Sequence, residues 1–134
     1  MQFQNNITFK AIGIVQNEFK EPTSAKRASG AEIKESESRI VLNPDLEEGL
    51  LGLEPGDQLM IIFHFHLSKG FDLHQHPRGD PSRDKRGVFA LRSPRRPNPI
   101  GVTVVELLGI KGNVLRVWGL DAIDGTPVLD LKPA

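Results

Sequence analysis

The sequence predicts a mainly β protein, folded as a small closed or nearly closed antiparallel β-barrel with one short helix and long loops. Three observations predict this fold class. The apolar segments are short, rich in Ile, Val and Phe, and bounded by Gly, Pro, Asn or Asp. The chain contains 13 Gly and 10 Pro residues, which suits many turns. A doubly wound parallel sheet would need a helix of about ten or more residues between its strands, and no helical periodicity of that length is present.

The expected elements follow one another along the chain with turn residues between them. The one short helix is expected over Pro44–Leu51, because Pro suits the first helical position and acidic residues follow it near the positive end of the helix dipole. A hairpin turn is expected at Lys111-Gly112-Asn113. The polar residues 20–37 and 68–86 are expected to form long loops. The expected strands cover residues 7–15, 38–42, 58–67, 87–91, 100–110, 114–120 and 128–131.

Length and composition narrow the class of protein. A chain of 134 residues is expected to form one domain, here a single β-barrel domain over residues 1–134. The absence of Cys excludes a disulfide scaffold, a thiolate metal site and a Cys nucleophile. The sequence has no run of 18 apolar residues and no signal-peptide pattern, so we expect a cytoplasmic protein without a membrane partner.

The formal net charge of zero conceals a basic segment in the middle of the chain. Residues 1–60 carry six basic and ten acidic side chains, whereas residues 69–96 carry eight basic and three acidic ones. The segment could be a solvated loop whose charges have no role. It could also bind an anion, such as a phosphate, a carboxylate or a nucleic-acid backbone.

Two loops have the composition of ligand-binding segments. Residues 92–101 contain three Pro within six positions, which makes a stiff extended loop that displays arginines at low entropic cost. Arg92 follows an apolar segment, where its guanidinium could hold a carboxylate or phosphate bidentately. Residues 120–127 combine two Asp with a Gly-Thr-Pro turn and could hold the polar rim of a ligand, such as ribose hydroxyls. Both loops could equally be structural, as a barrel crossover and a turn.

All four histidines lie within 13 positions, which raises the alternative of a cupin-like metal site. His64 and His66 are two residues apart in an expected strand, so they should share one face. His74 and His76 form a second pair, and imidazole pairs suit Zn or Fe. No carboxylate ligand is obviously placed, so the sequence favours histidines that are hydrogen-bonded in the barrel or contact a ligand, and no metal is expected.

Two motifs carry a resemblance to a known family. The first runs from Gly87 through Arg92-Ser93-Pro94 and Arg96-Pro97-Asn98-Pro99 to Gly101. The second runs from Leu120-Asp121 through Asp124-Gly125-Thr126-Pro127-Val128 to Lys132-Pro133. The opening Ile12-Gly13-Ile14-Val15 also fits, and with these motifs the sequence resembles the TsaA-like family, which includes the TrmO tRNA methyltransferases. The resemblance covers essentially the whole chain.

The resemblance implies a small β-barrel, usually a homodimer, that binds S-adenosylmethionine as cofactor near the interface. Bacterial members methylate N6 of the threonylcarbamoylated adenosine 37 in the tRNA anticodon loop. The basic residues of the middle segment would then contact tRNA, namely Arg78, Arg83, Lys85, Arg86, Arg95 and Arg96. The residues that would surround the cofactor are Arg27, Ala28, Ser29, His66, Leu67, Arg92, Leu120, Asp121, Ala122, Ile123 and Asp124. Where the family often has Pro-Arg-Gln, this chain has Lys26-Arg27-Ala28, so only Arg27 matches there.

The chemistry that this resemblance implies needs few conspicuous residues. Methyl transfer from a sulfonium is an in-line displacement that depends mainly on positioning. Arg92 would pair with the cofactor carboxylate, and Asp121 or Asp124 is a candidate base for the N6 proton. Two alternatives stay open. The chain could bind S-adenosylmethionine, or methylate a small molecule, without a tRNA substrate, or it could be a cupin-like metal-dependent enzyme.

Overall fold

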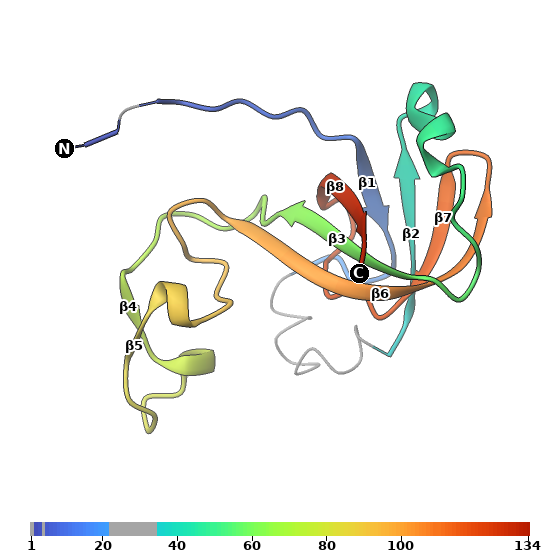
Figure 1. The fold of residues 1–134 in the computed structure, drawn as a ribbon. Helices are drawn as coiled ribbons and strands as arrows, with labels where there is room; N and C mark the ends of the chain where they lie inside the picture. The colour runs from blue at the N-terminus through green and yellow to red at the C-terminus, as the bar shows by residue number, and fades with distance from the viewer. Residues whose placement is uncertain (1, 4, 22–34) are drawn as a thin grey trace.

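A computed structural model describes residues 2–3, 5–21 and 35–134, and it contains a closed six-stranded antiparallel barrel (Figure 1). The strands run around the barrel in the order β1-β2-β7-β6-β3-β8, and β8 pairs with β1 to close it. The fold class expected from the sequence is therefore confirmed. The barrel strands are β1 Gly13–Gln16, β2 Glu37–Leu42, β3 Gln58–His64, β6 Ile100–Lys111, β7 Val114–Trp118 and β8 Pro127–Pro133.

The expected short helix is present as the 3₁₀ helix η1, Pro44–Leu50, with Pro at its start and acidic residues in its first turn. The expected hairpin is also confirmed, because Lys111 of β6 pairs with Val114 of β7 across a two-residue turn. Gly112 in that turn has φ 61°, a conformation that Gly adopts without a steric cost.

The core lies inside the barrel and follows the two-residue period of the strands. Along β3 the inward side chains Leu59, Ile61 and Phe63 are buried, and the residues between them are half-buried or exposed. The strands that flank β3 place Val105 and Val128 in the same core. Burial of these branched side chains stabilises the barrel by about 1.5–3 kcal/mol for each one that is fully enclosed.

Residues 65–99 leave the barrel between β3 and β6 and form a separate substructure, which we call the lobe. It contains the short strands β4 His74–Gln75 and β5 Arg86–Gly87, and the one-turn 3₁₀ helices η2 Pro77–Gly79 and η3 Val88–Ala90. β4 and β5 pair only with each other. Figure 1 shows the lobe set to one side of the barrel.

Residues 5–12, which we call the N-terminal arm, run along the outside of the molecule in extended form before β1 (Figure 1). The expected strand 7–15 was therefore wrong for its first six residues, since pairing begins only at Gly13. Ile7 and Phe9 are apolar and extended but remain largely exposed, because no strand in the described part of the chain pairs with them.

The other differences from the expected strands lie near the lobe and at the ends of two barrel strands, since β7 ends at Trp118 instead of residue 120 and β8 covers Pro127–Pro133 instead of 128–131. The expected strand 87–91 was wrong, since it is one residue of β5 followed by η3 and an extended residue. β3 ends at His64 instead of reaching residue 67. Among the described residues, no helix has the length and apolar content needed to cross a bilayer.

Candidate functional site

The two motifs of the resemblance meet on opposite sides of one residue, Phe63 near the end of β3. Phe63 pairs with Gly101, where the arginine-proline motif enters β6, and with Val128, which follows the Asp-Gly-Thr-Pro turn in β8. The motifs are about twenty residues apart in the sequence, and only the barrel closure brings them together. The end of β3, the start of β6 and the β7–β8 loop therefore form one end of the barrel, which we call the motif end.

Gly101 is required at this junction by the aromatic rings beside it. A Cβ atom built on Gly101 would lie 2.6 Å from the Phe63 ring and 2.7 Å from the Phe65 ring, closer than van der Waals contact permits. The two rings pack edge to face with centroids 5.2 Å apart. The Gly of the motif thus allows the chain of the lobe to return to the barrel against a rigid aromatic pair.

The β7–β8 loop, residues 119–126, is held firmly against the barrel. The side chains of Leu120, Ala122 and Ile123 are buried, so these three expected cofactor residues would offer a ligand their backbone groups. The Thr126 hydroxyl donates a 2.7 Å hydrogen bond to the Ile123 carbonyl, and both groups are buried. The loop is therefore a preformed edge of the motif end.

Asn17, which follows β1, fixes this loop from the other side. Its side-chain amide donates hydrogen bonds to the Ala122 carbonyl at 2.8 Å and to the Ser38 hydroxyl at 3.1 Å. Its backbone N–H donates to Oδ1 of Asp124 at 3.0 Å. The side-chain oxygen accepts the Phe19 N–H, so every hydrogen-bonding group of this side chain has a partner.

The two candidate bases differ in how their carboxylates are used. Asp124 accepts a hydrogen bond from the ammonium of Lys20 at 2.9 Å as well as the one from Asn17. These bonds, the one from Lys20 foremost, lower the pKa of Asp124. Asp121 is half-buried and has no hydrogen bond or ion pair within the described part of the chain. Asp124 therefore shapes the loop, whereas the carboxylate of Asp121 is available to a ligand.

A concave surface of about 770 Å³ lies at the motif end beside Asp124. It is lined by β1 with the residues that follow it and by residues 36–39 at the start of β2, and it contains both cationic and anionic side chains. This volume is in the range of sites that take nucleoside-sized ligands. The expected cofactor residues Arg27, Ala28 and Ser29 lie outside the described residues.

His66 and Leu67 follow the last residue of β3 and so lie at the motif end. The expectation that His64 and His66 share one face of a strand was wrong, because β3 ends at His64. In a tight turn, the His66 backbone N–H donates a 2.8 Å hydrogen bond to the His64 carbonyl. The Phe65 backbone N–H donates a hydrogen bond to the Pro99 carbonyl. His66 is half-buried and Leu67 is exposed. No group of three potential metal ligands is found among the described residues.

Arg92 lies in the lobe, in the chain that leads back to β6. It is exposed and has no hydrogen bond or ion pair among the described residues, so its guanidinium is available to a ligand. Arg96, four residues later, is different. Its guanidinium donates to the carbonyls of Leu91 and Ser93 at 2.9 and 3.1 Å, which holds the arginine-proline loop closed on itself.

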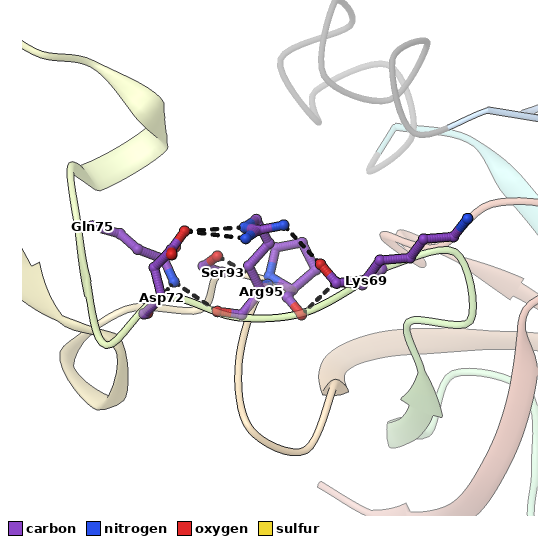
Figure 2. Close-up of polar contacts among 7 residues, drawn as sticks. Lys69, Asp72, Gln75, Ser93 and Arg95 are labelled. Atoms are coloured by element: carbon purple, nitrogen blue, oxygen red, sulfur yellow. Dashed lines mark hydrogen bonds and ion pairs between the residues drawn. The ribbon is translucent and has the colours of Figure 1, made fainter.

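Arg95 joins the two halves of the lobe (Figure 2). Its guanidinium contacts the Asp72 carboxylate at 3.1 and 3.3 Å and donates to the Lys69 carbonyl at 2.7 Å. Gln75 completes the link, because its amide donates to the carbonyls of Asp72 and Arg95. Arg95 and Arg96, both expected to contact RNA, are thus engaged inside the lobe.

The other four expected RNA contacts, unlike Arg95 and Arg96, are not bonded within the lobe. Their side chains are exposed and make no hydrogen bond or ion pair with the described residues. All four lie in η2, in β5 or between them, so the charge is concentrated on one part of the lobe. These residues are Arg78, Arg83, Lys85 and Arg86.

Sequence reasoning missed the residues that organise the site without facing a ligand. Asn17 and Lys20 lie in a polar stretch that carries no motif, and Ser38 is a small polar residue within an apolar strand. The only available signal was Ser38 itself, because a fully buried hydroxyl needs a hydrogen-bonding partner.

Three comparisons relate this chain to known proteins. The family model described as tRNA-methyltransferase O N-terminal domain matches residues 14–134. A probable S-adenosyl-L-methionine-binding protein of Pyrococcus abyssi is 43% identical over 128 residues, which cover 95% of this chain and 67% of that protein. The human tRNA (adenine(37)-N6)-methyltransferase is 44% identical over 98 residues, which cover 71% of this chain and 21% of that protein.

The structural comparison agrees with the sequence comparisons. The crystal structure of TrmO from Pseudomonas aeruginosa superimposes with a TM-score of 0.74 at 32% sequence identity. The match covers 97% of this chain and 56% of that one. The chain therefore spans a little over half of the TrmO structure and about a fifth of the human relative.

Proposed function

Since the chain belongs to the family of tRNA-methyltransferase O N-terminal domains, we propose that it is an S-adenosylmethionine-dependent methyltransferase that methylates N6 of adenosine 37 in tRNA. The observation that carries the proposal is the convergence of both motifs on Phe63. This convergence places a preformed loop with an available carboxylate at one end of the barrel, and Asp124 and Gly125 of that loop also line the concave surface.

Residues of the motif end and of the adjoining lobe suit the functional groups of S-adenosylmethionine. The cofactor, when bound, supplies a methyl group activated by a sulfonium. Arg92 offers an available guanidinium for the cofactor carboxylate, and the backbone of residues 120–124 offers polar groups to its nucleoside. His66 lies at the same barrel end and would orient one of these groups. The proposed cofactor contacts are therefore those expected from the sequence, apart from Asp124, whose role is to hold the loop.

The reaction also needs a place for a proton. When N6 of the adenine takes the methyl group, it loses one hydrogen as a proton. Asp121 is the better of the two candidate bases, because its carboxylate has no partner among the described residues whereas that of Asp124 has two. A carboxylate that accepts two hydrogen bonds is a weaker base.

For the substrate we propose the threonylcarbamoylated form of adenosine 37. The test is mass spectrometry of nucleosides from tRNA incubated with the protein and S-adenosylmethionine, using tRNA with and without the threonylcarbamoyl group. A mass increase of one methyl group only in the modified nucleoside is expected. Methylation of the unmodified adenosine would support the methyltransferase activity but would reject the threonylcarbamoylated adenosine as the required substrate.

The lobe is the proposed tRNA-binding surface. Arg78, Arg83, Lys85 and Arg86 present unpaired charge that could contact phosphates, and two exposed aromatic rings, Phe71 and Phe89, could stack on bases. Because phosphate contacts release counterions, tRNA affinity should fall steeply as salt is raised. An affinity that is independent of salt would reject the lobe as an RNA-binding surface.

We also propose a homodimer. The side chains of Ile7 and Phe9 in the N-terminal arm are 74% and 70% exposed. Two large apolar side chains exposed on one extended segment favour a surface that another protein covers. Light scattering of the full chain should give twice the monomer mass, and replacement of Ile7 and Phe9 by Ser should shift it toward the monomer. From the proposed tRNA substrate we also infer a cytoplasmic protein.

A second candidate function is S-adenosylmethionine binding without a tRNA substrate. The Pyrococcus relative is named only as an S-adenosyl-L-methionine-binding protein, which favours this alternative. Calorimetry separates the two functions. Binding of both S-adenosylmethionine and tRNA supports the methyltransferase, whereas cofactor binding without tRNA binding supports a sensor or a small-molecule methyltransferase.

A further inference from the structure

The lobe contains a second concave surface, away from the motif end. Its volume is about 450 Å³, and it lies between β4, η2 and the chain that leads to β5. We call it the lobe hollow. Its lining consists of Asp72, His74, Gln75, His76, Gly79 and Lys85.

The anionic and amide groups of the lobe hollow are already used. The Asp72 carboxylate is paired with the Arg95 guanidinium, which neutralises it. The side-chain nitrogen of Gln75 donates to two backbone carbonyls. The ammonium of Lys85 and the ring of His74 have no partner among the described residues. The available groups that line the hollow are therefore cationic or can become so.

The ring of His76 has a defined tautomer. Its Nδ1 lies 2.6 Å from the carbonyl oxygen of Arg83, and a carbonyl can only accept, so Nδ1 carries the hydrogen. In the neutral ring Nε2 then has a lone pair and cannot donate to an anion. In the protonated ring Nε2–H is a donor, so only that form of the ring can donate to an anion.

The backbone beneath the hollow is held in an uncommon conformation. Arg78 has φ 55° and Gly79 has φ 70°, two successive residues in the left-handed region. This conformation costs free energy at Arg78, which has a Cβ. Hydrogen bonds from Gly79 to His76 and from Asp80 to Pro77 maintain it. Gly79 thus lines the hollow without a side chain that would fill it.

We propose that the lobe hollow binds a phosphate group of the RNA backbone through Lys85 and the protonated ring of His76. This inference rests on the proposed tRNA substrate. Two further charges lie near His76. The Asp80 carboxylate opposes an anion, but it accepts hydrogen bonds from the backbone and hydroxyl of Ser82. The exposed guanidinium of Arg83 favours the anion.

The consequence is a tRNA affinity that depends on pH. Because only the protonated His76 ring donates to the phosphate, affinity should rise as the pH falls. Fluorescence anisotropy with one labelled tRNA, at constant ionic strength, should show an affinity about three- to tenfold higher near pH 6 than near pH 8.

Two variants, each with a matched control, test the roles of His76 and Lys85 in the lobe hollow. In His76→Asn the amide nitrogen can still donate to the Arg83 carbonyl, but the titrating ring is gone, so the pH dependence should disappear. The matched control is His64→Gln, which removes a histidine at the barrel end and should leave the dependence intact. Lys85→Gln should weaken binding at both pH values, whereas Lys111→Gln, in the β6–β7 hairpin, should not. A pH dependence that persists in His76→Asn, or full affinity in Lys85→Gln, would overturn the proposal.

A second probe separates this proposal from the tRNA substrate. Sulfate has a fixed charge in this pH range, so amide chemical shifts of Gly79 and Lys85 can be followed as sulfate is added. A response near pH 6 that is lost in Lys85→Gln supports an anion site even if tRNA does not bind, in which case only the tRNA substrate fails. No response to sulfate and no pH dependence of tRNA binding would overturn the proposed anion site in the lobe hollow, whereas the methyltransferase proposal would stand.

Discussion

The side-chain amide of Asn17 donates a 2.8 Å hydrogen bond to the carbonyl of Ala122, which joins the residues after β1 to the loop before β8. The two residues are 105 positions apart in the sequence. Because the same side chain also binds the buried hydroxyl of Ser38, it ties three segments together at the motif end. The loop that we assign to the cofactor is thus positioned by a residue that has no place in the motifs.

Replacement of Asn17 by Ala should therefore weaken cofactor binding through the loop. We expect the free energy of unfolding to fall by about 1–3 kcal/mol, since the variant leaves Ser38 and Ala122 without their partner. The affinity for S-adenosylmethionine should fall at least severalfold in calorimetry. The matched control is Asn43→Ala, whose amide bonds to the Ala11 carbonyl at the opposite barrel end. Equal cofactor affinities in both variants would show that Asn17 does not position the site.

Asp124 should contribute to the pH dependence of stability. The hydrogen bond from Lys20, with that from Asn17, lowers the pKa of this carboxyl in the folded protein. The resulting stabilisation is present above the unfolded pKa of about 3.9 and is lost as the pH falls through the lower, folded value. In urea denaturation the wild type should lose stability more steeply than Asp124→Asn below about pH 5. Parallel curves would contradict this role of the carboxylate.

Asp121 and Asp124 should affect different kinetic constants. If Asp121 accepts the N6 proton, Asp121→Asn should lower kcat by about 10²-fold or more and change the KM for the cofactor little. Asp124→Asn loosens the loop and should mainly raise that KM. Steady-state kinetics with varied S-adenosylmethionine would measure both. An unchanged kcat in Asp121→Asn would remove Asp121 as the base.

Arg92 should contribute a charged hydrogen bond to the cofactor. Arg92→Ala should weaken cofactor binding by about 1.5–3 kcal/mol, the range for such bonds, without an effect on the thermal midpoint. Because Arg92 has no hydrogen bond or ion pair with the described residues, its replacement removes no such interaction from the fold, and a change in affinity reports the cofactor contact. Calorimetry with Lys111→Ala as the control is the measurement, and an affinity equal to that of the wild type would reject the contact.

Gly101 should be sensitive to a single methyl group. Gly101→Ala forces the Phe63 and Phe65 rings to move and should lower the free energy of unfolding by about 1–3 kcal/mol. Gly49→Ala is the control, since a Cβ there meets no atom within 4 Å. Chemical denaturation of the two variants should differ accordingly, and similar stabilities would mean that the ring pair adapts freely.

The barrel was predictable because its strands carry their own signals. β2, β6, β7 and the hairpin turn at Gly112 follow from short apolar runs bounded by turn residues. Ile7 and Phe9 carry the same signal, but they precede the first pairing of β1 and pair with no strand among the described residues. Local composition cannot distinguish these cases, since pairing depends on the closure of β8 on β1.

The site was predictable only where it coincided with a motif. The sequence pointed to the loop at Asp121 and the arginine-proline segment as candidates, but not to which of their residues bond within the protein and which remain available to a ligand. The guanidinium of Arg95 pairs with the carboxylate of Asp72, 23 positions away, and the carboxylate of Asp124 pairs with the ammonium of Lys20, 104 positions away. Such pairings are set by tertiary structure, so a charge in the sequence does not reveal whether it faces a ligand or another residue.

The central claim is methyl transfer to N6 of adenosine 37. The most direct measurement follows the labelled methyl group of S-adenosylmethionine into one tRNA that carries threonylcarbamoyladenosine at position 37 and into the same tRNA with guanosine there. We expect incorporation into the first tRNA only, recovered as an N6-methylated nucleoside. No incorporation into either tRNA, or equal incorporation into both, would contradict it.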